Sequence, residues 1–309
     1  MTELKGIHHT YKLDLSEKNK RDFIAYRAHD EHKVLLYKCS DTFSKPSAYN
    51  TLLSIVHPNI NNPIDIIRIG GVTYMVSELL EGTSLKTILE TRKLYHKLPE
   101  SFFISLAIKI LEALAELHKH KVLHLDIKPS NILIRDTIDL HPSKWNADKV
   151  LITKLEKAAH YPISNNHNRF SLAYSPPEQL TNKMQLVSPS SDLYALAIML
   201  YEMIAGSPPF VDCEVDMLLQ LQLSYPIKKR PSMRQEFFDI INKATQKPAS
   251  VKVRDNTYDQ VLGKDLIDNI NHRYQLAEEM IADLEQYKHL IKEKRNISLW
   301  NRFLRLIGQ

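Results

Sequence analysis

One short stretch of this chain holds three side chains of types that could act on a charged substrate. Residues 124–133 read His-Leu-Asp-Ile-Lys-Pro-Ser-Asn-Ile-Leu, so Asp126, Lys128 and Asn131 lie close together in the sequence. A carboxylate can accept a proton, an ammonium group can neutralise an anion, and an amide oxygen can bind a metal ion. The stretch therefore predicts chemistry in which a proton and a negative charge are moved.

The elements that must position these side chains change along the chain. The N-terminal part contains short β-prone runs at residues 23–26, 34–37 and 72–80. Gly70-Gly71 predicts a hairpin turn before the last run, and a helix is expected over residues 48–56. From Ser101 to Leu117, apolar residues recur at helical spacing, which predicts a long buried helix.

A second apolar helix is predicted over residues 193–204, with Ser191-Asp192 as its cap and Gly206 beyond its end. Strands therefore come first and helices follow, without the alternation that is typical of a parallel sheet. This order predicts an α+β protein with two lobes.

Composition and charge narrow the classes of partner. The 309 residues are 43% hydrophobic and 25% charged, as in a globular protein with one large core or two modest lobes. The net charge of +5 equals the excess of the tail from Lys288 onward, which holds six Lys or Arg residues and one Glu. Because the remainder is balanced, no nucleic-acid partner is expected. The tail is amphipathic, and residues 290–309 could lie on an anionic membrane surface.

The cellular compartment is predicted from features that the sequence lacks. Cys39 and Cys213 are far apart and suggest neither a disulfide framework nor a zinc site. No apolar run reaches the length of a bilayer span, and the first residues lack the apolar core of a secretory signal. These features predict a cytoplasmic location, in a bacterium or in a host cell into which the protein is delivered.

Five ordered segments together resemble bacterial, eukaryotic-like Ser/Thr protein kinases. Residues 124–133 are similar to the catalytic loop H-x-D-x-K-x-x-N with its following strand. The other four segments are the hinge-like residues 78–85, the Ala-Tyr-Ser-Pro-Pro-Glu of residues 173–178, and residues 192–196 and 273–280. The resemblance covers roughly residues 10–290. It implies a bilobal kinase-like fold with a small strand-rich N-lobe (1–79), a larger helical C-lobe (80–290), insertions at about 135–149 and 248–270, and a separate basic tail (291–309).

The resemblance also implies roles for single residues. Asp126 would orient a substrate hydroxyl and accept its proton, Lys128 would neutralise the moving phosphoryl group, and Asn131 would bind Mg²⁺ if the chain is active. The residues implied to contact ATP are Lys38, the gatekeeper Ser77, the hinge residues Glu78 and Leu80, Leu133, and Lys154. The residues implied to support the structure are His124, Glu178, Asp192 and Arg273. Among these, Asp192 would brace the catalytic loop and Arg273 would pair with Glu178.

Several positions depart from the kinase pattern. Residues 15–23 contain no glycine to admit phosphates, and residues 48–56 contain no acid to pair with Lys38. Leu36 stands where the family has a small alanine above the adenine. Lys154-Leu155-Glu156 stands in place of Asp-Phe-Gly, and a lysine repels Mg²⁺ instead of binding it.

These departures predict a pseudokinase that binds an unknown protein partner as a scaffold or an allosteric regulator. No cofactor is expected to bind tightly: ATP could bind without Mg²⁺, and Mg²⁺ is not expected. One alternative is an atypical ATP-dependent Ser/Thr kinase, or another nucleotide transferase, that uses Asp126. Another alternative is a membrane-associated adaptor that acts through the basic tail. The sequence does not decide whether the protein is an enzyme, but the departures from the kinase pattern favour a protein without catalytic activity.

Overall fold

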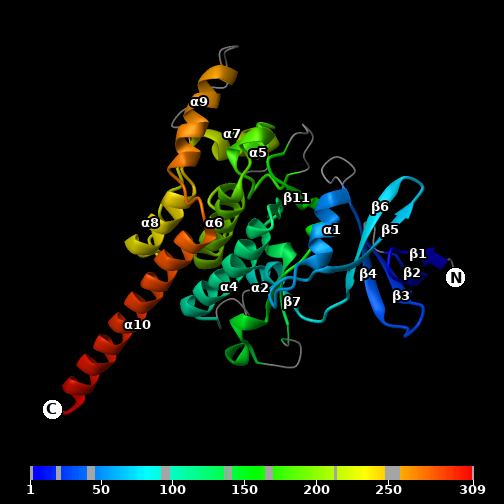
Figure 1. Ribbon diagram of the computed structural model, residues 1–309. Coiled ribbons are helices and arrows are strands. Elements are labelled where there is room, and N and C mark those ends of the chain that lie inside the picture. The colour runs from blue at the N-terminus through cyan, green and yellow to red at the C-terminus, as the bar shows by residue number, and fades with distance from the viewer. Residues whose placement is uncertain are drawn as a thin grey trace.

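The computed structural model describes residues 3–18, 22–39, 46–91, 98–135, 137, 141–163, 170–211, 214–247 and 258–307. A strand-rich N-terminal part is joined to a larger helical part, as Figure 1 shows. This arrangement confirms the predicted α+β, two-lobed architecture.

The N-terminal part is an antiparallel sheet of six described strands in the order β1-β2-β3-β4-β6-β5. The strands are β1 (Glu3–Lys5), β2 (Thr10–Lys18), β3 (Asp22–Arg27), β4 (Lys33–Lys38), β5 (Pro63–Ile69) and β6 (Val72–Glu78). The predicted hairpin at Gly70-Gly71 joins β5 to β6, and both glycines have positive φ angles of 55° and 79°. Glycine adopts this conformation without a Cβ clash, which explains the turn. Helix α1 (Pro46–Ser54) contacts β5 and ends two residues before the predicted boundary.

The helical part is built around two long helices, each with most of its apolar side chains buried. These are α4 (Glu100–Lys119), which matches the predicted long helix, and α6 (Pro189–Ala205). The remaining helices are α2 (Leu85–Glu90), α5 (Pro177–Leu180), α7 (Val215–Ser224), α8 (Gln235–Ala244), α9 (Tyr258–Asn271) and α10 (Ala277–Ile307). Apolar side chains of α4, α6, α8 and α10 share one core cluster with residues of α1.

The start of α6 corrects one expectation from the sequence. The N-cap is Ser188, with Pro189 in the first helical turn, so the helix begins earlier than predicted. Ser191 lies inside the helix, where its hydroxyl accepts a hydrogen bond from the Ser188 N–H at 3.2 Å. Asp192 does not cap the helix, because its carboxylate contacts the catalytic loop instead.

Two small sheets of short strands lie in the helical part, at and after the hinge-like residues. Strand β7 (Thr83–Ser84) pairs with β9 (Ile132–Ile134), which pairs with β10 (Val150–Ile152). Strands β8 (Val122–Leu123) and β11 (Ala159–His160) form a separate pair. Gly82 lies so close to β9 that a Cβ atom at this position would be 2.4 Å from the carbonyl oxygen of Ile134. Only glycine permits this approach of two backbones.

The two predicted insertions contain helical turns where they are described. Within residues 135–149, the short helices η2 (Pro142–Lys144) and η3 (Ala147–Lys149) flank Trp145, which packs into the main core. Within residues 248–270, α9 begins at Tyr258, and residues 248–257 lie outside the described residues.

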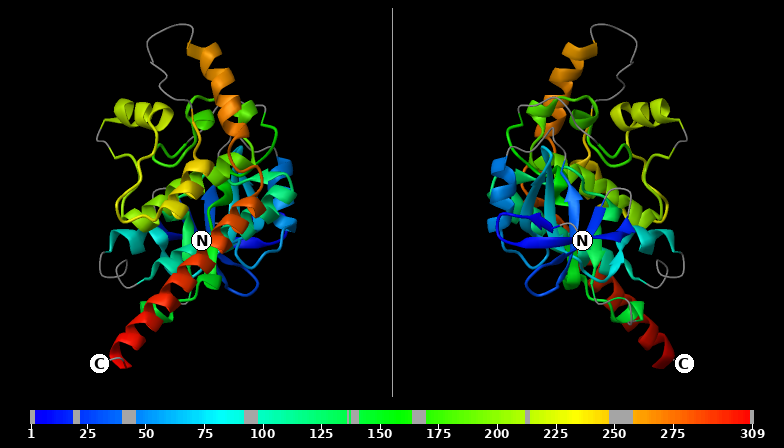
Figure 2. Two further views of the ribbon diagram at one scale, coloured as in Figure 1. Left: turned by 90° about the vertical axis from the view of Figure 1, so that its left-hand side faces the viewer. Right: turned by 90° about the vertical axis from the view of Figure 1, so that its right-hand side faces the viewer.

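The predicted tail is the continuation of α10. Leu284 and Tyr287 are buried, Ile291 packs against the core, and the Lys294 Nζ lies 2.9 Å from Glu236 on α8. Beyond these contacts the helix continues away from the rest of the chain, as Figure 2 shows. The side chain of Trp300 lies outside the described residues. No described helix is both long and apolar enough to cross a bilayer.

Candidate active site

The catalytic-loop segment is held by one buried carboxylate on α6. Asp192 accepts hydrogen bonds from the backbone N–H groups of His124 and Leu125, each at 2.9 Å, and its Oδ2 lies 2.9 Å from His118 Nε2. Burial alone would raise the pKa of Asp192, but the His118 contact and the backbone N–H groups outweigh it, so the pKa is lowered. These bonds hold Leu125 in a left-handed conformation with φ of 64°.

The next residue, Asp126, has donors on both carboxylate oxygens. Oδ1 accepts from the Ser171 hydroxyl at 2.8 Å and lies 2.8 Å from the Nζ of Lys157. Oδ2 accepts from the Asn131 amide at 3.0 Å and lies 2.8 Å from the Nζ of Lys128. The structure thus brings together the three residues predicted from the loop, and it adds Lys157 and Ser171.

Two ammonium groups determine the charge state of Asp126. Burial raises its pKa, but Lys157 and Lys128 lower it more strongly, to a net pKa of about 2. A carboxyl group in an unfolded chain has a pKa of about 3.9. Because the folded pKa is depressed, the ionised pair stabilises the fold above pH 4 and this contribution is lost as the pH falls towards 2.

This pH-dependent loss of stability should be measurable by comparing the natural chain with the Asp126→Asn variant. The contribution of Asp126 ionisation is about 2 kcal/mol at neutral pH. We expect the stability gap between the natural chain and Asp126→Asn to be largest above pH 5 and to shrink as the pH falls from 4 to 2. Urea unfolding at several pH values checks this. A gap that stays constant over this range would contradict the assigned ion pairs.

Lys154, which the sequence pattern aligns with the metal-binding aspartate of kinases, closely follows the strand pair β9–β10. Thr153 donates its N–H and its hydroxyl to the Asn131 carbonyl, at 2.9 and 3.1 Å, and its own carbonyl lies 3.2 Å from His124 Nε2. Lys154 follows with φ of 62° and ψ of 63°, a left-handed conformation, and its Nζ lies 6.0 Å from the centre of the Tyr37 ring. The ammonium group of Lys154 therefore lies near β4 of the N-terminal sheet, while its backbone directly follows Thr153, which is bonded to the catalytic loop.

Lys38 lies at the exposed end of β4, opposite Tyr74 of β6. Among the described residues, no carboxylate lies within ion-pairing distance of its ammonium group. Helix α1 instead contacts β11, because the Thr51 hydroxyl lies 3.1 Å from His160 Nε2. The helix is therefore linked to the other lobe without an acidic side chain.

The residues predicted to contact an adenine lie at the junction of the lobes. Ser77 is buried on β6, and the Glu78 carbonyl accepts a long 3.4 Å hydrogen bond from the Asn61 amide. Leu80 and Leu133 are half-buried. Leu36 is 1% exposed and packs in a second core cluster with residues such as Val34 and Val76.

The ion pair expected to support the helical part is present. The Arg273 Nη1 lies 2.9 Å from Glu178 Oε1, and both side chains are fully buried. The Ser191 hydroxyl also donates to Glu178 Oε1, at 2.7 Å, and the Arg273 guanidinium lies 4.9 Å from the centre of the Tyr194 ring. This pair joins α5 and α6 to the segment before α10.

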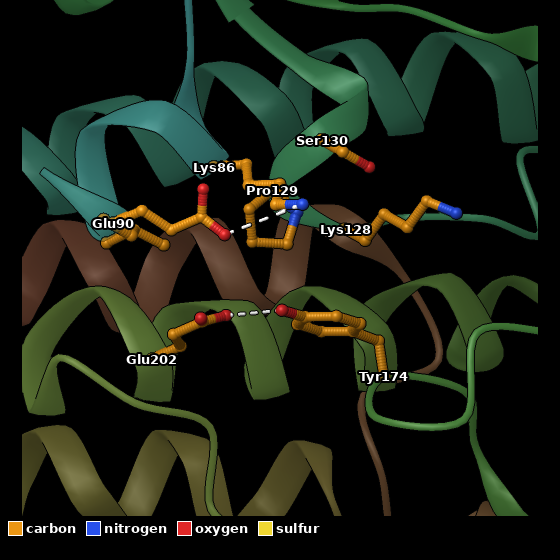
Figure 3. A pocket seen from close by; sticks show the side chains of 8 residues that line it. Lys86, Glu90, Lys128, Pro129, Ser130, Tyr174 and Glu202 are labelled. Atoms are coloured by element: carbon orange, nitrogen blue, oxygen red, sulfur yellow. Dashed lines mark hydrogen bonds and ion pairs between the residues drawn. The ribbon is translucent and has the colours of Figure 1, made fainter.

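A cavity of about 300 Å³ lies beside the catalytic loop, between α2 and α6. Figure 3 shows carboxylates entering it from opposite walls, Glu90 from α2 and Glu202 from α6. Burial raises the pKa of Glu202, and the neighbouring Glu90 adds to this effect, while a 2.7 Å hydrogen bond from the Tyr174 hydroxyl opposes it. Lys86 and Lys128 also line the cavity, and the Lys86 Nζ lies 3.6 Å from Glu90 Oε1, so two ammonium groups balance the two carboxylates.

Sequence reasoning missed four residues of this site: Lys157, Ser171, Tyr174 and Glu202. Lys157 directly follows the Lys154-Leu155-Glu156 triplet, so a search for further cations beside the triplet would have found it. Ser171 carried no recognisable signal, because its contact with Asp126 depends on a fold of the chain across 45 residues.

Comparisons with known proteins agree with this geometry. A sequence profile described as "Protein kinase domain" matches residues 17–283. Similar curated proteins are the probable serine/threonine-protein kinase CPE1738 of Clostridium perfringens (29% identical), serine/threonine-protein kinase PrkC of Bacillus subtilis (30%) and serine/threonine-protein kinase PknB of Mycobacterium leprae (30%). The matches cover 77%, 75% and 70% of this chain but 30%, 32% and 30% of the relatives. The chain therefore spans about a third of their length.

Proposed function

This chain belongs to the protein kinase family, and on that premise we propose that it is a pseudokinase. It would work by binding a protein partner, as a scaffold or an allosteric regulator, without efficient phosphate transfer. The observation that carries the proposal is Lys154, which follows β10 in a left-handed conformation at the position of the family's metal-binding aspartate. A lysine there contributes a positive charge where phosphate transfer needs a ligand for Mg²⁺.

The carboxylate of Asp126 is not free to bind a magnesium ion either. Mg²⁺ needs oxygen ligands in a nearly octahedral arrangement. The Asn131 Nδ2 donates both to the carbonyl oxygen and to the carboxylate of Asp126, and that carboxylate already has four donors. A metal ion would have to displace these donors next to three lysines.

Nucleotide binding, if it occurs, would be weak and independent of Mg²⁺. Lys38 and Lys154 could attract phosphates without a metal, because ammonium groups neutralise anionic oxygens. Opposing this, Leu36 fills the space that a small residue would leave above the adenine. We therefore propose no tightly bound cofactor.

A thermal-shift assay tests the proposal. We expect ATP with Mg²⁺ and ATP with EDTA to change the Tm of the natural chain equally, within about 1 °C. Lys154→Asp should gain a shift that requires Mg²⁺, because it supplies the missing carboxylate. Lys119→Asp is the matched control, since it makes the same charge change at an exposed lysine on α4. A large Mg²⁺-dependent shift of the natural chain, abolished by Lys38→Ala, would overturn the proposal and favour an enzyme.

The alternative function is an atypical Ser/Thr kinase that uses Asp126 as its proton acceptor. It is supported by the cluster of Asp126, Lys128 and Asn131 and by the names of the relatives, which are Ser/Thr kinases. Incubation with radiolabelled ATP and a generic protein substrate distinguishes the two readings. Mg²⁺-dependent labelling that is lost in Asp126→Ala would support the enzyme.

The tail offers a different partner, an anionic membrane, which we retain as a second alternative together with a cytosolic location. We expect α10 to dock on the body through its N-terminal half, as far as Lys294, because Tyr287 is buried and Lys294 pairs with Glu236. Truncation before Lys294 should therefore lower the Tm by a few degrees, which corresponds to a loss of about 1 kcal/mol in the free energy of unfolding. Truncation after Arg295 should leave it nearly unchanged but should remove any salt-sensitive binding to anionic vesicles. An unchanged Tm after the longer truncation would argue against docking.

A further inference from the structure

Lys157 is the one partner of Asp126 that comes from the segment directly after Lys154. It is the last residue of the short helix η4 (Leu155–Lys157), and its ammonium group is 2.8 Å from Asp126 Oδ1. The side chains of Lys157 and Asp126 are 14% and 3% exposed, so the pair is shielded from water. Removing one partner of a shielded pair leaves the other charge uncompensated, which costs more than breaking a pair at the surface.

The donors around Asp126 occupy the carboxylate completely. An ionised carboxylate offers about four lone-pair sites. Ser171 and Lys157 contact Oδ1, and Asn131 and Lys128 contact Oδ2, all at 2.8–3.0 Å. A substrate hydroxyl could approach Asp126 as a proton donor only by displacing one of these four groups.

We infer that Lys157 is a positioning residue. Its ammonium group is the counter-ion of the Asp126 carboxylate, and the pair gives Asp126 the structural role of an anchor. The anchor fastens the segment after Lys154 to the catalytic loop. This inference rests on the proposed function, because a carboxylate that serves as an anchor is not available to accept a substrate proton.

The contacts beyond Lys157 show what the anchor holds. The chain continues into β11, which pairs with β8 directly before the catalytic loop. His160 of β11 lies 3.1 Å from the Thr51 hydroxyl on α1 and 3.1 Å from the Lys121 carbonyl. Loosening Lys157 should therefore loosen β11 and its contact with α1, which connects the two lobes.

Hydrogen exchange of the full chain tests the inference. We expect Lys157→Met to increase amide exchange in residues 155–161 roughly tenfold relative to the natural chain, which corresponds to about 1.4 kcal/mol of local stability. Lys157→Arg keeps the charge and should retain most of the protection. Lys119→Met, an exposed lysine on α4, is the control that should change nothing in this segment. If Lys157→Met exchanges like Lys119→Met, the inference is wrong.

A double-mutant cycle distinguishes the loss of this ion pair from a general loss of stability. Asp126→Asn and Lys157→Met each should speed exchange in residues 155–161, and the double variant should be no faster than about twice the faster single variant. Effects that multiply instead would overturn the pairing. This result does not depend on magnesium: a large Mg²⁺-dependent thermal shift would refute the pseudokinase proposal, whereas loss of protection in Lys157→Met would still establish the anchor.

Discussion

Replacing Arg273 by alanine is expected to lower the free energy of unfolding by about 3–5 kcal/mol, because it leaves the buried carboxylate of Glu178 without its counter-ion. Neither side chain of the pair is exposed to water, so solvent cannot replace the lost partner. The variant also removes the 2.8 Å hydrogen bond from the Arg273 Nε to the Gln246 carbonyl. Urea unfolding at neutral pH measures the loss.

A second ion pair of the same lobe provides the control. Lys243 lies 3.2 Å from Asp283, but the two side chains are 48% and 39% exposed. Lys243→Ala should therefore cost less than about 1 kcal/mol. The double change Glu178→Gln with Arg273→Met should lose less than the sum of the single changes, because no charge remains buried. Equal losses in Arg273→Ala and Lys243→Ala would contradict the role assigned to burial.

The second large effect is expected at Asp192, which is buried on α6. Asp192→Ala removes the acceptor for the backbone N–H groups of His124 and Leu125 and for the His118 ring. Each buried donor left without an acceptor costs about 1–3 kcal/mol, so a loss of about 3 kcal/mol or more is expected. Faster hydrogen exchange should appear first at residues 124 and 125.

Asp192→Asn should have an intermediate effect. Its amide keeps one acceptor oxygen, so this variant should lose less free energy of unfolding than Asp192→Ala does. Asp239→Ala, on the surface of α8, controls for the loss of an aspartate as such. If all three variants unfold at the same urea concentration, the carboxylate does not brace the loop.

Local patterns predicted the elements of this fold well. Gly70-Gly71 specified a hairpin because glycine alone tolerates both positive φ angles, and helical periodicity located α4 to within one residue of its start. The pattern failed at α6, where Ser191-Asp192 looked like a cap. Ser188 and Pro189 provide the real start, and the Asp192 carboxylate is used in a tertiary contact that periodicity does not describe.

The site was predictable only in part, for a similar reason. Asp126, Lys128 and Asn131 are neighbours in the sequence, so their meeting in space follows from one loop. Lys157 contacts Asp126 from the short helix that follows Lys154, whose left-handed conformation has no local signal in a lysine. The distinction between an available and an occupied carboxylate therefore required the fold.

The contact between Gly82 and the Ile134 carbonyl has a mechanical consequence for the two lobes. Because the backbone at Gly82 touches β9, this point moves with the helical part. A rotation of the sheet relative to the helical part would therefore have to bend residues 79–81 and also the bridge between Ile60 and Ile152, where the chain before β5 meets β10. A methyl group at position 82 would clash with the Ile134 carbonyl of β9 and push the two segments apart. We expect this change to alter the angle between the sheet and the helices, although every charge in the site stays the same.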